Sequence, residues 1–146
     1  MIRAVLDTNT LVSGLLVPGG MPARIVLAAF ADQFLCFSSD AIVAEVLATL
    51  RRPRIQRKYQ LDAATISRVT TFLSSDPVRV PLTVAVHGAA SHPEDDLILA
   101  TALSARADYL VTGDRQLQAL GSYQGVQIVS PRTFLGVLDG PDAVTS

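Results

Sequence analysis

The sequence predicts an α/β fold, in which a five-stranded parallel sheet carries helices on both faces. Short β-like apolar runs alternate with longer segments whose apolar residues recur every three or four positions. The chain has 146 residues, which fits one domain, and 49% of them are hydrophobic, enough for a packed core. We expect the strand order 3-2-1-4-5. Because parallel crossovers are right-handed, each helix begins at the carboxyl edge of the sheet, where ligands bind in such folds.

The predicted strands are short runs rich in branched and aromatic residues, as buried parallel strands require. They are residues 2–6, 34–38, 78–82, 109–112 and 126–129.

The predicted helices have apolar residues on one face. They are residues 23–30, 41–50, 62–73, 94–107, 116–120 and 133–138. In the third of these we expect Ile66, Val69 and Leu73 to point inward. Residues 13–22 hold three glycines and two prolines and are predicted to form a loop.

The helix at residues 41–50 has a continuous apolar face. That face consists of Ile42, Val43, Val46, Leu47 and Leu50. We expect residues 1–138 to form the domain and residues 139–146, rich in Gly, Pro, Asp and Ser, to form a flexible tail.

Composition excludes several classes of protein. The hydrophobic content of 49% excludes a disordered chain, and the net charge of −1 excludes a polycation that coats nucleic acid. The lone cysteine, Cys36, excludes an intrachain disulfide and lies in an apolar run, as a buried thiol in a reducing compartment would. No apolar run approaches ~18 residues, and the N-terminus lacks a signal-peptide pattern. We therefore expect a cytoplasmic protein without a membrane span.

Acidic residues follow the predicted strands and open the predicted helices. Asp7 ends the first strand, Glu45 lies in the second turn of a helix, residues 94–96 are three acids that open another helix, and Asp114 lies two residues past the fourth strand. In a parallel sheet all of these positions lie at the carboxyl edge. The topology therefore predicts that acids distant in the sequence converge on one side of the molecule.

Clustered carboxylates predict a divalent cation. Nearby like charges raise one another's pKa, and a hard cation removes this conflict. Ligand sets made only of oxygen select Mg²⁺ or Mn²⁺, which can activate water and hold a phosphodiester for attack. The competing sites are absent from the sequence: His87 and His92 are too few for zinc, and there is neither a nucleophile elbow nor a P-loop.

Each acid also has a structural interpretation. Ser91 and Glu94 have the spacing of a capping box, and we assign Glu94 to that role. Asp95 and Asp96 could complement the helix dipole, and Asp114 could be a turn residue. Glu45 could likewise be a surface acid on its helix. A structural role explains Asp7 least well, because it follows a buried strand.

The order of these motifs resembles that of the PIN-domain ribonucleases. The resemblance rests on Val-Leu-Asp-Thr-Asn at residues 5–9, Glu45 in a helix, Asp95 followed by the apolar residues 97–102, and Val-Thr-Gly-Asp at residues 111–114. It extends over about residues 2–135. The greatest likeness is to the bacterial PIN-family toxins of toxin–antitoxin systems, which are related to the VapC-type toxins.

The resemblance implies a function for each of four acids. Asp7, Glu45, Asp95 and Asp114 correspond to the acidic quartet with which such enzymes bind Mg²⁺ or Mn²⁺ and cleave RNA. Asp7, Asp95 and Asp114 would be the metal ligands, and Glu45 would help to hold the metal or position water.

Three further residues would support the quartet. Asn9 and Thr112 would orient carboxylates through hydrogen bonds. The third acidic position could be Asp95 or Asp96; the spacing to residues 100–102 favours Asp95 and leaves Asp96 as an auxiliary acid.

A basic segment follows the helix that carries Glu45. If it borders the active cleft, its cations would bind RNA phosphates and Tyr59 could stack on a base. A solvated helix end is the alternative interpretation. The cations are Arg51, Arg52, Arg54, Arg57 and Lys58.

The sequence therefore predicts a metal-dependent endoribonuclease, most simply a toxin. The resemblance implies an RNA substrate, an antitoxin partner and a homodimer; the helix at residues 23–30 could dock a partner or belong to the core. A non-catalytic PIN-fold module that binds RNA or protein is the alternative. A phosphotransfer receiver domain is disfavoured, because the only lysine is Lys58 and no acid pair follows the first strand.

Overall fold

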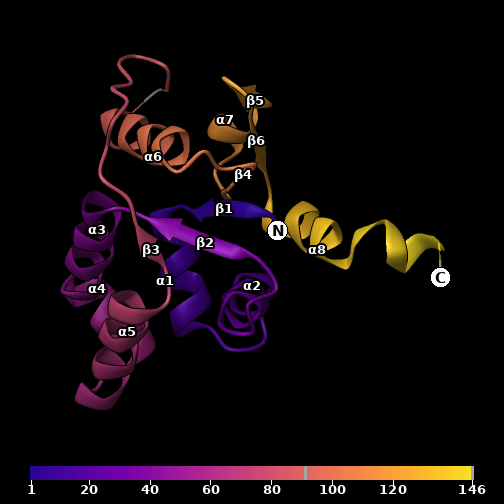
Figure 1. Ribbon diagram of the computed structural model, residues 1–146. Coiled ribbons are helices and arrows are strands. Elements are labelled where there is room, and N and C mark those ends of the chain that lie inside the picture. The colour runs from indigo at the N-terminus through magenta and orange to yellow at the C-terminus, as the bar shows by residue number, and fades with distance from the viewer. Residues whose placement is uncertain (91, 146) are drawn as a thin grey trace.

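The computed structural model describes residues 1–90 and 92–145 and shows an α/β fold around one sheet (Figure 1). The sheet has six strands in the order β3-β2-β1-β4-β6-β5. Their bounds are β1 Arg3–Leu6, β2 Leu35–Ser38, β3 Val78–Arg79, β4 Tyr109–Val111, β5 Ser122–Tyr123 and β6 Val126–Val129.

The five predicted strands are all present and mutually parallel in the predicted order, although the strand predicted at residues 78–82 spans only Val78–Arg79. The prediction of a five-stranded sheet is nevertheless wrong, because β5 adds a sixth, antiparallel edge strand beside β6. The turn between them places Gln124 at φ 46° and Gly125 at φ 91°. Two central residues with positive φ form the tight turn that suits a β-hairpin, and glycine takes that conformation without strain.

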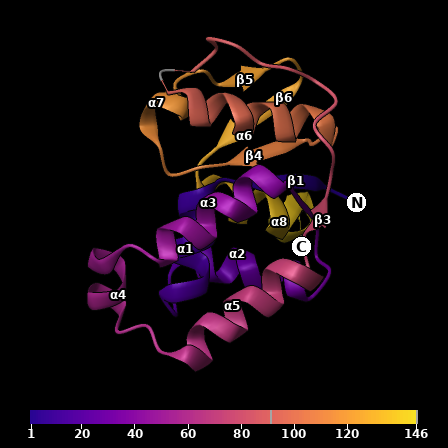
Figure 2. The same cartoon turned by 90° about the vertical axis from the view of Figure 1, so that its left-hand side faces the viewer.

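Eight helices occur in the described residues, on both faces of the sheet (Figures 1 and 2). Helix α6 packs against β1, β2 and β4 on one face, whereas α8 contacts β4 and α2 on the other face, where α1 and α2 also lie. The bounds are α1 Thr8–Leu16, α2 Met21–Phe30, α3 Asp40–Leu50, α4 Pro53–Tyr59, α5 Ala63–Ser75, α6 Pro93–Ser104, α7 Arg115–Gln118 and α8 Pro131–Thr145.

The prediction of a loop at residues 13–22 is wrong at both ends, because α1 extends to Leu16 and α2 begins at Met21. Helix α1 begins after Asp7, whose side chain accepts a hydrogen bond from the backbone N–H of Thr10, and it continues through Gly14 to Leu16. A Cβ at Gly14 would lie 2.5 Å from Cγ2 of Val26 and 2.8 Å from the carbonyl oxygen of Pro22. Gly14 is therefore a point of close contact between α1 and α2 and not a helix breaker.

Other helices also differ from the prediction; α6, for example, ends at Ser104 and not at residue 107. Helix α4 was not predicted, although Pro53 suits the first turn of a helix. Helix α6 begins after His92, which makes no side-chain cap; Ser91, the predicted capping residue, lies outside the described residues. Helix α8 continues past residue 138 with a break at Gly140, where φ is 72° and ψ is 174°.

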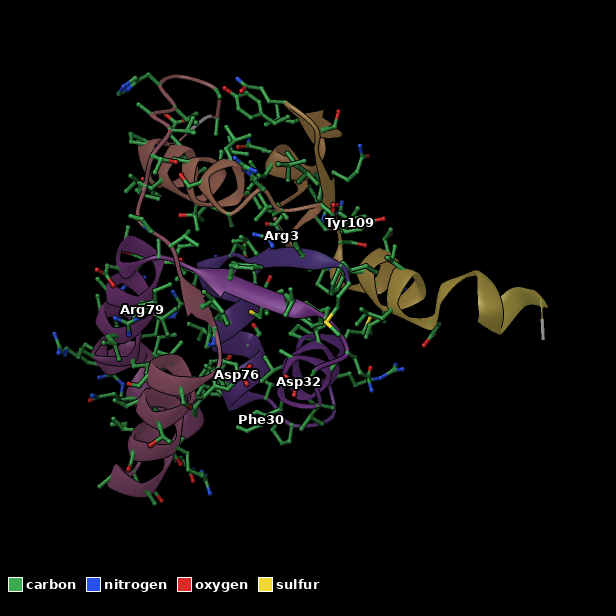
Figure 3. The ribbon with its side chains drawn as sticks, in the orientation of Figure 1. Arg3, Phe30, Asp32, Asp76, Arg79 and Tyr109 are labelled. Atoms are coloured by element: carbon green, nitrogen blue, oxygen red, sulfur yellow. The ribbon has the colours of Figure 1, made fainter. Side chains whose placement is uncertain are left out.

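The core fills both faces of the sheet. Phe34 and Phe134 meet edge to face with ring centroids 5.0 Å apart, and Tyr109 packs against Phe134 at 5.7 Å. On the opposite face, the guanidinium of Arg3, which is labelled in Figure 3, lies 4.4 Å from the ring centroid of Phe37. Of the predicted inward side chains of α5, Val69 and Leu73 are buried, but Ile66 is 36% exposed, so that prediction is wrong for Ile66.

The apolar face of α3 and the lone cysteine are placed as predicted. Ile42, Val43, Val46 and Leu50 are buried, and Leu47 is partly buried against them. Cys36 is buried in β2, and burial raises the pKa of its thiol to about 12. Such a thiol is inert at neutral pH.

No single helix in the described ranges is long and apolar enough to cross a membrane; α1 and α2 reach that length and composition only as a pair bent by 89°.

Candidate active site

A pocket of about 310 Å³ lies at the carboxyl edge of the sheet. Figure 2 looks toward this edge, with α6 on one side of the sheet and α1 and α3 on the other. The end of β1, the helices α3 and α6 and the turn after β4 all contribute to its wall. Five acids line it: Asp7, Glu45, Glu94, Asp95 and Asp114. The structure thus brings the four acids of the predicted quartet into one pocket.

Asp7 is buried and held by two hydrogen bonds. Its Oδ1 accepts from the backbone N–H of Thr10 at 2.8 Å, and its Oδ2 accepts from the hydroxyl of Thr112. Burial raises the pKa of Asp7, the hydrogen bonds oppose this shift, and the charge of Asp114 adds to it. The carboxylate is therefore fixed in direction but costly to keep ionised without a cation nearby.

Asp114 is positioned by the helix that it caps. Its Oδ1 accepts from the backbone N–H groups of Gln116 at 2.8 Å and Leu117 at 3.2 Å, at the start of α7. Its own N–H donates to Oγ1 of Thr112 at 3.0 Å. Thr112 is fully buried and therefore links the two acids Asp7 and Asp114.

Asp95 and Asp96 are adjacent in α6 but have different surroundings. Asp95 lines the pocket and accepts no hydrogen bond from the described residues; burial, followed by the charge of Asp114, raises its pKa. Asp96 does not line the pocket, and its two oxygens accept from the backbone N–H groups of Gly88 at 2.9 Å and Ala90 at 3.1 Å. Only Asp95 therefore faces the other acids.

Glu45 lies on the opposite wall from α6 and pairs with a cation. Arg52 approaches it at 3.5 Å, and both side chains are about half exposed, 46% for Glu45 and 61% for Arg52. The ion pair is weak in water, so each group remains available to another partner.

Comparison with known proteins identifies the family. The PIN domain family matches residues 3–116, a segment that contains all four acids of the predicted quartet. The chain belongs to the PIN domain family. It is also 28% identical over 119 residues to the uncharacterized protein MJ1680 of Methanocaldococcus jannaschii, across 82% of this chain and 75% of that protein. PIN domains are in general nucleases and typically use divalent metals.

The donor set of this PIN domain fits a hard divalent cation. The pocket offers carboxylate oxygens as ligands, and the charge of Asp114 raises the pKa of both Asp7 and Asp95. Within the described residues, no three His, Cys, Asp or Glu side chains are already gathered closely enough to hold a metal. The fit to a hard cation is therefore one of donor chemistry.

The predicted supporting residues have unequal roles in the PIN domain. Thr112 bonds to Asp7 as predicted, but Asn9 is exposed at the rim, and no hydrogen bond joins its side chain to a carboxylate of the described residues. The backbone N–H of Thr10 holds Asp7 instead. The sequence could have indicated this bond, because an Asp at the N-cap of a helix commonly accepts a hydrogen bond from the backbone N–H three residues later.

The basic segment reaches the pocket at one residue. Arg52 lines it, whereas Arg51, Arg54, Arg57 and Lys58 do not and lie in or beside the exposed helix α4. The ammonium of Lys58 lies 5.2 Å from the ring centroid of Tyr59.

His92 also lines the pocket, although the sequence analysis did not predict it as a site residue and weighed it only as a zinc ligand. Its position at the start of α6, directly before Pro93, was the available signal.

Proposed function

We propose that this PIN domain is an endoribonuclease that depends on Mg²⁺ or Mn²⁺. The observation that carries the proposal is that Asp7, Asp95 and Asp114, contributed by three separate elements, line one pocket together. Burial and the charge of Asp114 raise the pKa of Asp7 and Asp95, as expected of acids that require a cation.

Each acid has a distinct part in this proposal. Asp7, Asp95 and Asp114 would hold the ion; Asp7 and Asp114 are oriented by hydrogen bonds, and Asp95 is free to turn toward it. Glu45 would position a water on the α3 side of the pocket. When bound, the ion would activate that water for attack on an RNA phosphodiester.

RNA would approach across the basic segment. Arg52 is placed at the pocket wall, where its planar guanidinium could exchange Glu45 for a phosphate. We expect Arg→Ala changes at Arg51, Arg54 and Arg57 to weaken RNA binding and to leave metal affinity unchanged. An unchanged dissociation constant for RNA at low salt would contradict this part of the proposal.

We further propose that the protein is the toxin of a toxin–antitoxin pair, related to the VapC-type toxins, and forms a homodimer. Leu27 and Phe30 on α2 are 66% and 59% exposed, which supports a partner on this helix. Size-exclusion chromatography with light scattering tests the dimer, and co-expression with the product of a small upstream reading frame tests the antitoxin.

The activity is tested with purified protein and single-stranded RNA, with and without Mn²⁺. Wild-type protein should cleave only with the metal, and Asp7→Asn and Asp95→Asn should each abolish cleavage while the fold is retained. Asp139→Asn is the matched control, since Asp139 is an exposed acid outside the pocket. Equal cleavage by wild type and the Asp7→Asn variant would indicate contamination and reject the assignment.

A non-catalytic binding module is the second candidate. It is favoured by the spacing of the acids, because no three of them in the described residues are already gathered as a metal site. RNA or metal binding without turnover, under conditions in which the fold is intact, would support this candidate instead.

A further inference from the structure

The acidic pocket continues into a groove. A second hollow, of about 320 Å³, shares Asn9 and Asp114 with the pocket. A third, of about 450 Å³, shares Pro22, Gly113 and Pro131 with the second. The three hollows therefore form one track that leads away from the acids.

The track follows the carboxyl ends of neighbouring strands. Val111 of β4 pairs with Val129 of β6, and Gly113 and Pro131 each lie two residues beyond these paired ends. The groove thus leaves the pocket beside β1, crosses the end of β4 and reaches the end of β6, along the edge that Figure 2 presents.

Gly113 keeps the crossing open. A Cβ built at Gly113 meets nothing within 4 Å, and its φ lies outside the left-handed region. The backbone there does not require glycine, and the space beside its Cα, in the hollows that Gly113 lines, is open to a larger side chain. The absence of a side chain at Gly113 therefore keeps space open in the groove and is not required by the backbone conformation.

The lining suits a ribonucleotide strand. Pro22 and Pro131 offer flat apolar surfaces, as a ribose or base requires, and Ser13 and Asn9 offer hydrogen bonds. Arg132 lies at the far end, exposed and without an ion pair to any described residue. No acid is among the described residues that line the third hollow. The charge along the track thus changes from acidic at the pocket to basic at Arg132.

We propose that this groove guides the RNA strand on one side of the cleaved phosphodiester. Arg132 contacts a backbone phosphate, and the nucleotides between it and the acids pass over Gly113, between Pro22 and Pro131. This inference rests on the proposed ribonuclease function and adds to it a substrate requirement. The enzyme needs single-stranded RNA that extends from the cleaved bond in one direction.

The test compares short RNA oligonucleotides that extend from the cleaved bond on the 5′ side, on the 3′ side or on neither. In wild-type protein, extension on one side should raise kcat/KM about tenfold, as one or two stacked or ion-paired nucleotides would. Gly113→Leu should lose that gain and still cleave the unextended substrate. Gly136→Leu is the matched control, because Gly136 also has open space around it and lines none of the three hollows.

Arg132→Ala provides a second variant, should Gly113→Leu fold poorly. It should lose part of the gain and show a weaker dependence of KM on salt, whereas Arg68→Ala on α5 should behave as wild type. Equal affinity for Mn²⁺ in all variants would show that the acidic pocket is intact.

The outcomes separate the two proposals. Wild-type protein that cleaves no RNA with Mn²⁺ overturns the proposed function. Wild-type protein that cleaves RNA but gains nothing from either extension, or gains as much after Gly113→Leu, overturns the groove alone.

Discussion

The hydroxyl of Thr112 donates a hydrogen bond to the buried carboxylate of Asp7 and accepts one from the backbone N–H of Asp114. One fully buried side chain therefore connects two acids that are more than a hundred positions apart in the sequence. If Asp7 and Asp114 hold the proposed cation, Thr112 should contribute strongly to its affinity, because it orients both ligands.

Thr112→Val should lower the affinity for Mn²⁺ by roughly 10–100-fold, because valine has the shape of threonine but neither donates to Asp7 nor accepts from Asp114. Thr112→Ser retains the hydroxyl and should bind Mn²⁺ nearly as wild type does. Isothermal titration calorimetry measures both constants. A Val variant with wild-type affinity would show that Thr112 does not position the ligand.

Asp95 and Asp96 should separate metal binding from stability. Asp95→Asn should remove most of the Mn²⁺ affinity and leave the free energy of unfolding unchanged or higher, since the fold disfavours the charge of Asp95. Asp96→Ala removes the acceptor of the Gly88 and Ala90 N–H groups, which are exposed and part-buried, and should cost about 1 kcal/mol, with metal affinity retained. Urea unfolding measures the stability of both variants, and calorimetry measures their Mn²⁺ affinity. Loss of Mn²⁺ affinity in Asp96→Ala but not in Asp95→Asn would assign the metal to Asp96.

Gly14→Ala should destabilise the protein by about 1–3 kcal/mol, because the added methyl group overlaps the Val26 side chain and the Pro22 carbonyl. Gly136→Ala is the control: it lies in a helix with free space around it and should stabilise the fold by up to about 1 kcal/mol. Urea unfolding measures the difference. Equal stabilities for the two variants would mean that α1 and α2 can separate without cost.

Asp76, which does not line the acidic pocket, should make the stability of the fold depend on pH. Asp76 follows α5 and lies near Asp32, and both are labelled in Figure 3. Burial and, after it, the charge of Asp32 raise the pKa of Asp76 above its usual value of 3.8. Folding therefore favours the protonated form, and stability falls as the pH rises from 3.8 through the raised pKa.

Asp76→Asn removes this titration, so its melting temperature should exceed that of the wild type at neutral pH and approach it near pH 4. The gain at neutral pH should be small, because the side chain is only partly buried. Thermal melts across this range test the expectation, and Asp139→Asn is the control. Parallel melting curves for wild type and Asp76→Asn at every pH would contradict it.

The sequence was sufficient to bring the acids together, because parallel topology places strand ends and helix starts at one edge whatever the details of packing. Asp7, Glu45, Asp95 and Asp114 share a pocket for that reason. Contacts over short distances could not be predicted in the same way. The residues next to Gly14 in the sequence do not show whether it lies in a helix or a loop. The reason for glycine at this position is the close contact with Pro22 and Val26, which exists only once α2 has packed against α1.

The sixth strand and the exposure of Ile66 on α5 could not be predicted from the sequence for a similar reason. Strand β5 spans two residues, too few to show an alternating pattern, and its pairing depends on the tight turn that ends at Gly125. Ile66 fits the helical period, but α5 lies at the margin of the fold, so the first turn of its apolar face remains exposed. The position of Arg52 beside Glu45 depends on where α3 ends, which a run of cations does not define.

Asp7 and Asp114 each use one carboxylate oxygen to cap a helix, α1 and α7 respectively. Their rotational freedom is thus lost when the chain folds and not when a ligand arrives. Binding to these two acids should therefore carry a small unfavourable side-chain entropy, and the ordering that remains falls mainly on Asp95. If the proposed cation binds here, the heat of binding should accordingly reflect dehydration of the ion and the carboxylates more than any tightening of the scaffold.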